Sequence, residues 1–88
     1  MLERSISPRA NIRSVANRDG GVLLDIERGQ MLSANPMGAW IWQMIEAGKS
    51  RTEIIRAIGD ECGVDTGVVA RDVDEFLTSL RSHHLVSE

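Results

Sequence analysis

The sequence predicts a small α+β domain in which a three-stranded antiparallel sheet is followed by three helices. Two observations predict it. Residues 22–27 alternate in the manner of a strand, whereas after residue 35 apolar residues recur at helical spacing behind clear capping signals. The chain has 88 residues, 42% of them hydrophobic, which suffices for one modest core. We therefore expect a flexible arm over residues 1–10 and a single domain over residues 11–88.

The sheet is expected between residues 11 and 34. Residues 11–16 carry a weak strand signal and end in the turn cluster of residues 17–21. In the next strand, two alternating sets of side chains point to opposite faces: Val22, Leu24 and Ile26 on one, and Leu23, Asp25 and Glu27 on the other. Gly29 supplies the positive φ of a compact hairpin, and residues 30–34 form the returning strand.

The first helix is expected from about residue 36 to residue 47. Asn35 is a strong N-cap, and Pro36 fits the first helical position because its missing N–H has no helical partner there. Of its two tryptophans, we expect Trp42 to be buried against the sheet and Trp40 to be partly exposed.

Two further helices follow. Ser50 and Glu53 have the spacing of a capping box, which opens a second helix that ends near Gly63. Asp65 caps a third helix over about residues 66–83. Its apolar stripe has 3.6-residue spacing and consists of Val69, Val73, Phe76, Leu77 and Leu80.

Charge and composition exclude several classes of protein. The net charge of −3 arises after residue 20, because residues 1–20 carry four arginines against Glu3 and Asp19. An acidic body argues against nucleic acid as the ligand. One cysteine permits no internal disulfide, which favours a reducing compartment. The N-terminus lacks the apolar run of a signal peptide, and no segment is long enough to cross a membrane. We expect a soluble cytoplasmic protein.

Catalytic and metal-binding constellations are not found. Cys62, His83 and His84 show neither the paired spacing of a zinc site nor a third orienting group for a nucleophile. The sequence contains no glycine-rich phosphate loop. We therefore expect no enzyme activity, no cofactor and no metal.

The stretch from Gly29 to Ile45 contains no charged residue. Sheet edges are usually protected by lysines, other charges, prolines or bulges, and residues 30–34 have none of these. Such a strand can be either a buried central strand or an open edge. As the last strand of a three-strand meander it must be an edge, unless a segment from outside pairs with it.

A family resemblance extends from Pro8 to Val86. It is carried by Leu23-Leu24-Asp25, Gly29, the run Asn35–Trp42, Thr52–Ile55, Gly63-Val64-Asp65, Arg71-Asp72-Val73, Phe76-Leu77 and Leu85-Val86. The order of these pieces resembles that of the PqqD-like proteins, also called RiPP recognition elements (RiPPs are ribosomally made, post-translationally modified peptides). Residues 31–34 depart from the family, whose members often have aromatic residues and a leucine there.

The resemblance implies a winged-helix-like fold and a non-catalytic role. Family members bind the leader segment of a precursor peptide as a strand beside their third strand. They present it to a modifying enzyme such as a radical-SAM protein or a leader peptidase. This is β-augmentation, in which main-chain bonds supply pairing and side-chain pockets supply selectivity. In this sequence the candidate peptide-binding residues are Gln30, Met31, Leu32, Ser33 and Ala34 on the strand, and Val68, Arg71, Asp72 and Glu75 on the third helix.

Two of these residues have specific expected roles. Arg71 is the expected partner of an acidic leader residue, although an ion pair with a neighbouring acid within this chain is an equal alternative. Leu32→Pro is the expected test of pairing with the leader, because proline removes a ladder donor, so a folded variant should bind the leader less tightly than the wild type.

Two alternatives come from other functional classes. The second and third helices resemble a DNA-binding helix-turn-helix, but the third carries four acids against Arg71 and Arg81, the wrong sign for phosphates. The second alternative is a homodimer formed by edge-to-edge pairing of residues 30–34.

Overall fold

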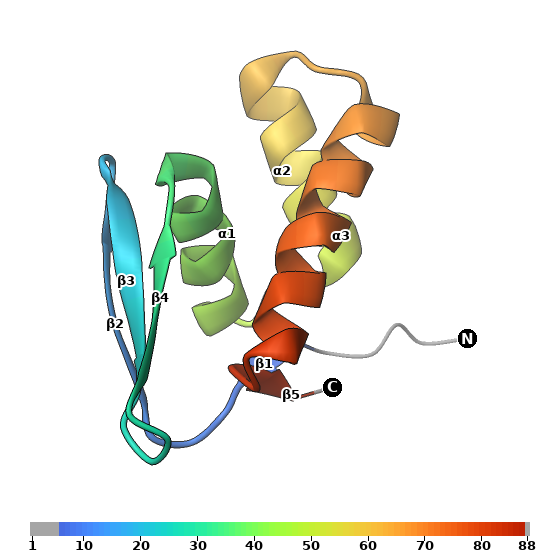
Figure 1. The fold of residues 1–88 in the computed structure, drawn as a ribbon. Coiled ribbons are helices and arrows are strands. Elements are labelled where there is room, and N and C mark those ends of the chain that lie inside the picture. The colour runs from blue at the N-terminus through green and yellow to red at the C-terminus, as the bar shows by residue number, and fades with distance from the viewer. Residues whose placement is uncertain (1–5, 88) are drawn as a thin grey trace.

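The computed structural model describes residues 6–87 of the protein. In Figure 1 a sheet stands at one side of the molecule and the helices at the other. The elements in chain order are β1 (Ser7–Pro8), β2 (Ile12–Asn17), β3 (Gly20–Asp25), β4 (Gln30–Ala34), α1 (Pro36–Glu46), α2 (Arg51–Cys62), α3 (Thr66–Ser82) and β5 (Val86–Ser87). The predicted order of three sheet strands and three helices is confirmed. No helix within residues 6–87 is both long and apolar enough to span a membrane.

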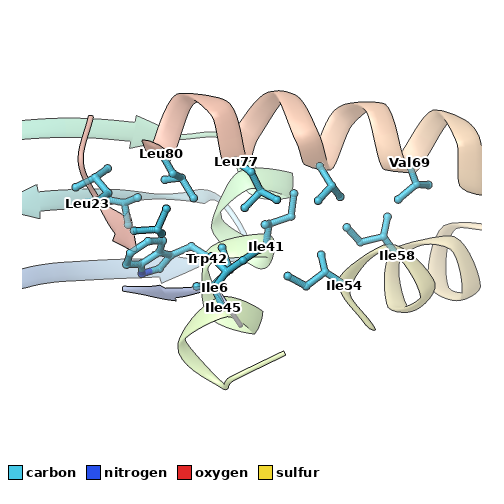
Figure 2. Packing of buried hydrophobic residues seen from close by; sticks show 13 residues of the cluster. Ile6, Leu23, Ile41, Trp42, Ile45, Ile54, Ile58, Val69, Leu77 and Leu80 are labelled. Carbon is cyan, nitrogen blue, oxygen red and sulfur yellow. The ribbon is translucent and has the colours of Figure 1, made fainter. Parts of the chain in front are cut away.

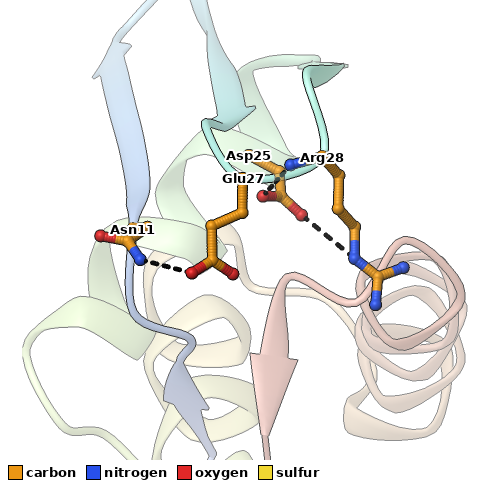
Figure 3. Close-up of polar contacts among 4 residues, drawn as sticks. All are labelled: Asn11, Asp25, Glu27 and Arg28. Carbon is orange, nitrogen blue, oxygen red and sulfur yellow. Dashed lines mark hydrogen bonds and ion pairs between the residues drawn. The ribbon is translucent and has the colours of Figure 1, made fainter.

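The three strands β2, β3 and β4 form one antiparallel sheet in that order. The turn from β3 to β4 joins the paired residues Asp25 and Gln30, and Gly29 has the predicted positive φ of +65°. The Asp25 carboxylate is buried, accepts the Arg28 N–H at 3.1 Å and lies 3.8 Å from Arg28 Nε (Figure 3). Asp25 therefore holds the turn that starts β4.

The two faces of the sheet differ in their burial. The inner face carries the buried Leu23 and the half-buried Leu32, which belong to the core. The outer face carries four exposed apolar side chains, Val15, Val22, Leu24 and Met31. Because both faces of β3 are apolar, the alternation in the sequence predicts the strand but not which face is covered.

The three helices begin at the caps that the sequence predicts. The Asn35 side chain accepts the Gly38 N–H at 2.8 Å and caps α1. Ser50 and Glu53 form both bonds of the capping box on α2, and the Asp65 side chain caps α3. These local bonds satisfy backbone donors that have no partner within the helix.

The core lies where α1 meets the sheet and the other two helices (Figure 2). Trp42 of α1 is fully buried, together with Ile54 of α2 and Leu77 of α3, whereas Trp40 is only partly buried. Both predictions for the tryptophans are confirmed. The Trp42 Nε1–H is buried and finds no hydrogen-bond partner among the described residues. The indole therefore contributes volume to the core rather than a polar contact.

The N-terminal segment departs from the sequence prediction. The domain was expected to begin at residue 11, yet Ile6 is 5% exposed and belongs to the core. β1 pairs with β5 in a second, two-stranded sheet, and the Arg9 N–H donates to the Leu85 carbonyl at 3.0 Å. Pro8 pairs with Val86, 78 residues further along the chain, and Ser7 pairs with Ser87, 80 residues further. No local sequence signal therefore marks this pairing. The expected flexible arm is therefore wrong for residues 6–10, and its first five residues lie outside the described range.

An ion pair on the surface joins α2 to α3. Arg51 Nε and Nη2 donate to the two Asp74 carboxylate oxygens at 2.7 and 2.9 Å. These hydrogen bonds lower the pKa of Asp74 below its ordinary value. Since the two side chains are 39% and 51% exposed, solvent screening limits the pair to about 0.2–1 kcal/mol.

We expect Asp74→Asn to lower the free energy of unfolding by that small amount at neutral pH. A carboxyl group whose pKa is lowered by folding stabilises the fold above its unfolded-state pKa. That stabilisation is lost as the pH falls through the folded-state pKa. The difference between variant and wild type should therefore shrink in acid. Urea unfolding at neutral pH and at about pH 3 measures it. An equal difference at both pH values would contradict the assignment.

Candidate functional site

The β4 strand forms one edge of the three-stranded sheet. It pairs with β3 on one side, and none of the other described strands pairs with its second side (Figure 1). It also contains no lysine, proline or acidic residue that would guard such an edge. The edge expected from the order of the strands is therefore present.

The register of the sheet determines which backbone groups of β4 face this edge. Successive residues of an antiparallel strand direct their N–H and C=O groups alternately to its two sides. The Ile26 N–H donates to the Asn11 carbonyl at 3.2 Å and extends the β2–β3 register by one pair. The backbone groups of Ile26 therefore face β2, as do those of every second residue before it in β3. The backbone groups of Leu23, and of the residues two positions from it, face β4.

The five candidate strand residues consequently fall into two sets. Gln30, Leu32 and Ala34 are the partners of the β3 residues that face β4, so their backbone groups belong to the sheet. Met31 and Ser33 direct their N–H and C=O groups to the open edge, and their side chains are also exposed. Of the five residues, two can therefore pair with an added strand.

The opposite edge of the sheet, β2, is partly occupied by α1. By the same alternation, the Ala16 carbonyl points away from β3. There it accepts a hydrogen bond from Gln43 Nε2 at 3.0 Å. This bond independently supports the assigned register. Ser14 Oγ also contacts the Glu46 carboxylate at 3.3 Å. An added strand would therefore meet α1 side chains at β2, whereas no strand among residues 6–87 pairs with the outer side of β4.

A hollow of about 540 Å³ lies between the start of α1 and α3. We call it the α1–α3 groove. Its lining residues are Asn35, Met37, Gly38 and Ile41 from the α1 side and Asp72, Glu75, Phe76 and Ser79 from α3. These α3 residues are spaced three, four and seven apart and so form one face of the helix.

Gly38 allows the close approach of α1, β4 and α3 at the groove. A Cβ at this position would lie 2.9 Å from Phe76 Cε1 and 3.3 Å from Ala34 Cβ. The Phe76 ring and the Ala34 side chain both lie next to Gly38, so the end of β4 and the groove face of α3 meet here.

The candidate residues on α3 are placed unequally with respect to the groove. Asp72 and Glu75 line it, whereas Val68 and Arg71 are not among its lining residues. Arg71 instead borders another hollow, together with Asp74, Glu75 and Thr78. Phe76 and Ser79 also line the groove and were not among the residues predicted from the sequence. Their spacing of four and seven residues from Asp72 places them on the same helix face and could have indicated them. The sequence does not show which part of that face lies near β4.

The groups considered for catalysis are far apart. Cys62 is exposed before the first turn of α3, and His83 follows its last turn, where Nδ1 lies 2.8 Å from the Ser79 carbonyl. The intervening helix of 17 residues spans about 25 Å. Within the described residues no three potential metal ligands cluster.

Comparison with known proteins identifies the family. The family profile described as coenzyme PQQ synthesis protein D (PqqD) matches residues 20–86, which is most of the chain. The chain belongs to the PqqD family. No curated protein sequence matches it.

Three solved structures resemble this PqqD-family chain. TbiB1, in complex with the TbiA(β) leader peptide, has a TM-score of 0.86 and 32% identity over 92% of this chain and 94% of its own. Lasso peptide synthetase B1, complexed with the leader peptide, has a TM-score of 0.83 and 25% identity over 94% of this chain and 98% of its own. The PqqD truncation of Methylobacterium extorquens PqqCD is described as a functional and stand-alone RiPP recognition element. It has a TM-score of 0.78 and 14% identity over 96% of this chain and 89% of its own, which shows a likeness of fold.

Proposed function

We propose that this protein binds the leader segment of a ribosomally made precursor peptide and presents it to a modifying enzyme such as a radical-SAM protein or a leader peptidase. The observation that carries the proposal is the open edge of β4, where Met31 and Ser33 offer their backbone groups. Membership of the PqqD family and the likeness to two structures solved with leader peptides support it. The protein holds the peptide and catalyses no reaction on it.

The leader lies beside β4 as an added strand. The N–H and C=O groups of Met31 and Ser33 supply up to four main-chain bonds to it. At about 1 kcal/mol net each, these bonds correspond to a complex of roughly millimolar affinity. Tighter binding requires side chains of the leader in the α1–α3 groove, where each buried apolar anchor adds about 1.5–3 kcal/mol. Main-chain pairing thus sets the geometry, and the groove sets affinity and selectivity.

Amide hydrogen exchange tests the strand-addition mechanism. In the free protein, the Met31 and Ser33 amides should exchange quickly and the Leu32 amide slowly, because only Leu32 is bonded within the sheet. Addition of a peptide selected from a randomised library should slow exchange at Met31 and Ser33. The slowing should reach about 100-fold when the free peptide is at 100 times its Kd. The measurement is NMR-detected exchange on the labelled protein.

The Leu32 amide is the internal control, since its exchange reports on the stability of the sheet rather than on the edge. Protection that appears only on α3, or uniformly over the domain, would contradict pairing at β4. Failure to select any binding peptide would contradict peptide binding itself.

A further inference from the structure

The α1–α3 groove is acidic. Two of its lining residues, Asp72 and Glu75, are exposed carboxylates one turn apart on the same face of α3. None of the described residues that line it is a lysine or arginine. A peptide strand beside β4 directs alternate side chains toward this groove, because successive side chains of a strand point to opposite faces.

Neither carboxylate has another role in the described part of the fold. Asp74, the acid between them in sequence, is bonded to Arg51, but no hydrogen bond or ion pair among the described residues involves the side chain of Asp72 or Glu75. They are not needed as helix caps, since Asn35 caps α1 and Asp65 caps α3. Two unpaired acids therefore face the space that a bound peptide would fill.

We propose that the peptide recognised by this chain carries a lysine or arginine whose cationic group pairs with Asp72 and Glu75. This proposal rests on the proposed function. The aliphatic stem of such a side chain lies along Met37 and Phe76 of the groove while its charged end reaches the carboxylates. The peptide excludes water from one side of the pair, which strengthens it relative to an ion pair on an open surface.

The basic leader residue proposed here is opposite in charge to the acidic leader residue expected as the partner of Arg71. Arg71 is not among the groove-lining residues and borders a separate hollow with Asp74, Thr78 and Glu75, of which only Glu75 also lines the groove. A leader strand that enters the groove therefore meets Asp72 and Glu75 directly. The groove selects for a basic residue, and an acidic one at the same position is repelled.

The test is a selection of binding peptides from a randomised library against three proteins. These are the wild type, the double variant Asp72→Asn/Glu75→Gln, and the double variant Asp60→Asn/Glu61→Gln. The last pair are exposed acids on α2, outside the groove, and their neutralisation changes the net charge by the same amount. Thermal unfolding verifies that all three are folded.

We expect lysine or arginine to be enriched at one position by the wild type and by the α2 control, and not by the groove variant. A selected peptide should then bind the groove variant about three- to tenfold more weakly. Changing the basic residue of this peptide to glutamine should weaken its binding to the wild type by the same factor. The same change should leave its binding to the groove variant almost unaltered. That non-additivity locates the interaction between the two groups.

Two results would overturn the proposal, and they differ. Peptides that bind through β4 without basic enrichment, or with acidic enrichment, would refute the charge selection and leave peptide binding intact. If no peptide is enriched by any of the three proteins, the proposed function fails and the charge selection fails with it.

Discussion

Replacing Ser33 with proline should leave the protein folded and weaken its binding of a selected peptide by about tenfold or more. The register directs the Ser33 N–H to the open edge of β4, so proline removes a donor that the sheet itself does not use. Proline is tolerated on edge strands where the missing N–H faces outward. Its ring also occupies the space next to the edge that a guest strand needs.

Proline at the adjacent Leu32 should have the opposite consequence. The Leu32 N–H faces β3, where Leu32 pairs with Leu23, and its half-buried side chain packs on the core. Loss of this ladder bond should lower the free energy of unfolding by about 1–3 kcal/mol, and the steric conflict of the ring adds to that loss. The proline at Leu32 considered from the sequence therefore tests the sheet and not the edge.

Circular dichroism with urea unfolding measures stability, and fluorescence anisotropy with a labelled peptide measures binding. Unfolding of Ser33→Pro together with a well-folded Leu32→Pro would show that the register has been assigned with the wrong parity. A folded Ser33→Pro protein that binds peptide as tightly as the wild type would contradict strand addition at β4.

The Gly20→Ala variant should lose about 2–6 kcal/mol of stability, the sum of backbone strain and overpacking. Gly20 has a φ of +130°, which side chains rarely adopt, and a Cβ there would lie 2.6 Å from the Ala34 carbonyl oxygen. That oxygen belongs to the backbone and cannot turn aside as a side chain would. For a domain of this size, the expected fall in Tm is at least about 10 °C.

Gly29→Ala is the matched control. Gly29 also has a positive φ, +65°, but nothing lies within 4 Å of the position that a Cβ would take. It should therefore lose only the conformational part, about 1–2 kcal/mol. Thermal and urea unfolding compare the two. If Gly20→Ala were no less stable than Gly29→Ala, the close approach of Gly20 to the end of β4 would be refuted.

Local signals in the sequence predicted most of the elements of this fold. Asn35-Pro36, the capping box of Ser50 and Glu53, and Asp65 mark the helix starts, because each side chain bonds to backbone donors only a few residues away. The neutral residues 30–34 indicated the edge only together with the order of the strands, since the last strand of a three-strand meander has no further strand of the chain beside it.

The sequence did not predict features that depend on distant segments. The pairing of β1 with β5 joins Pro8 to Val86, so residues 6–10 appeared to be an arm. Leu23 and Leu24 are equally apolar, and only the packing of α1 on one face makes Leu23 buried and leaves Leu24 exposed.

The candidate site shows the same division. The sequence by itself determined that β4 is an unguarded edge and that α3 carries Asp72 and Glu75. The structure alone decided that Met31 and Ser33 face outward, and that the groove face of α3 runs from Asp72 to Ser79. The physical reason is that caps and edge guards act within a few residues. The parity of a β-ladder and the rotation of a helix are set by neighbours remote in the chain.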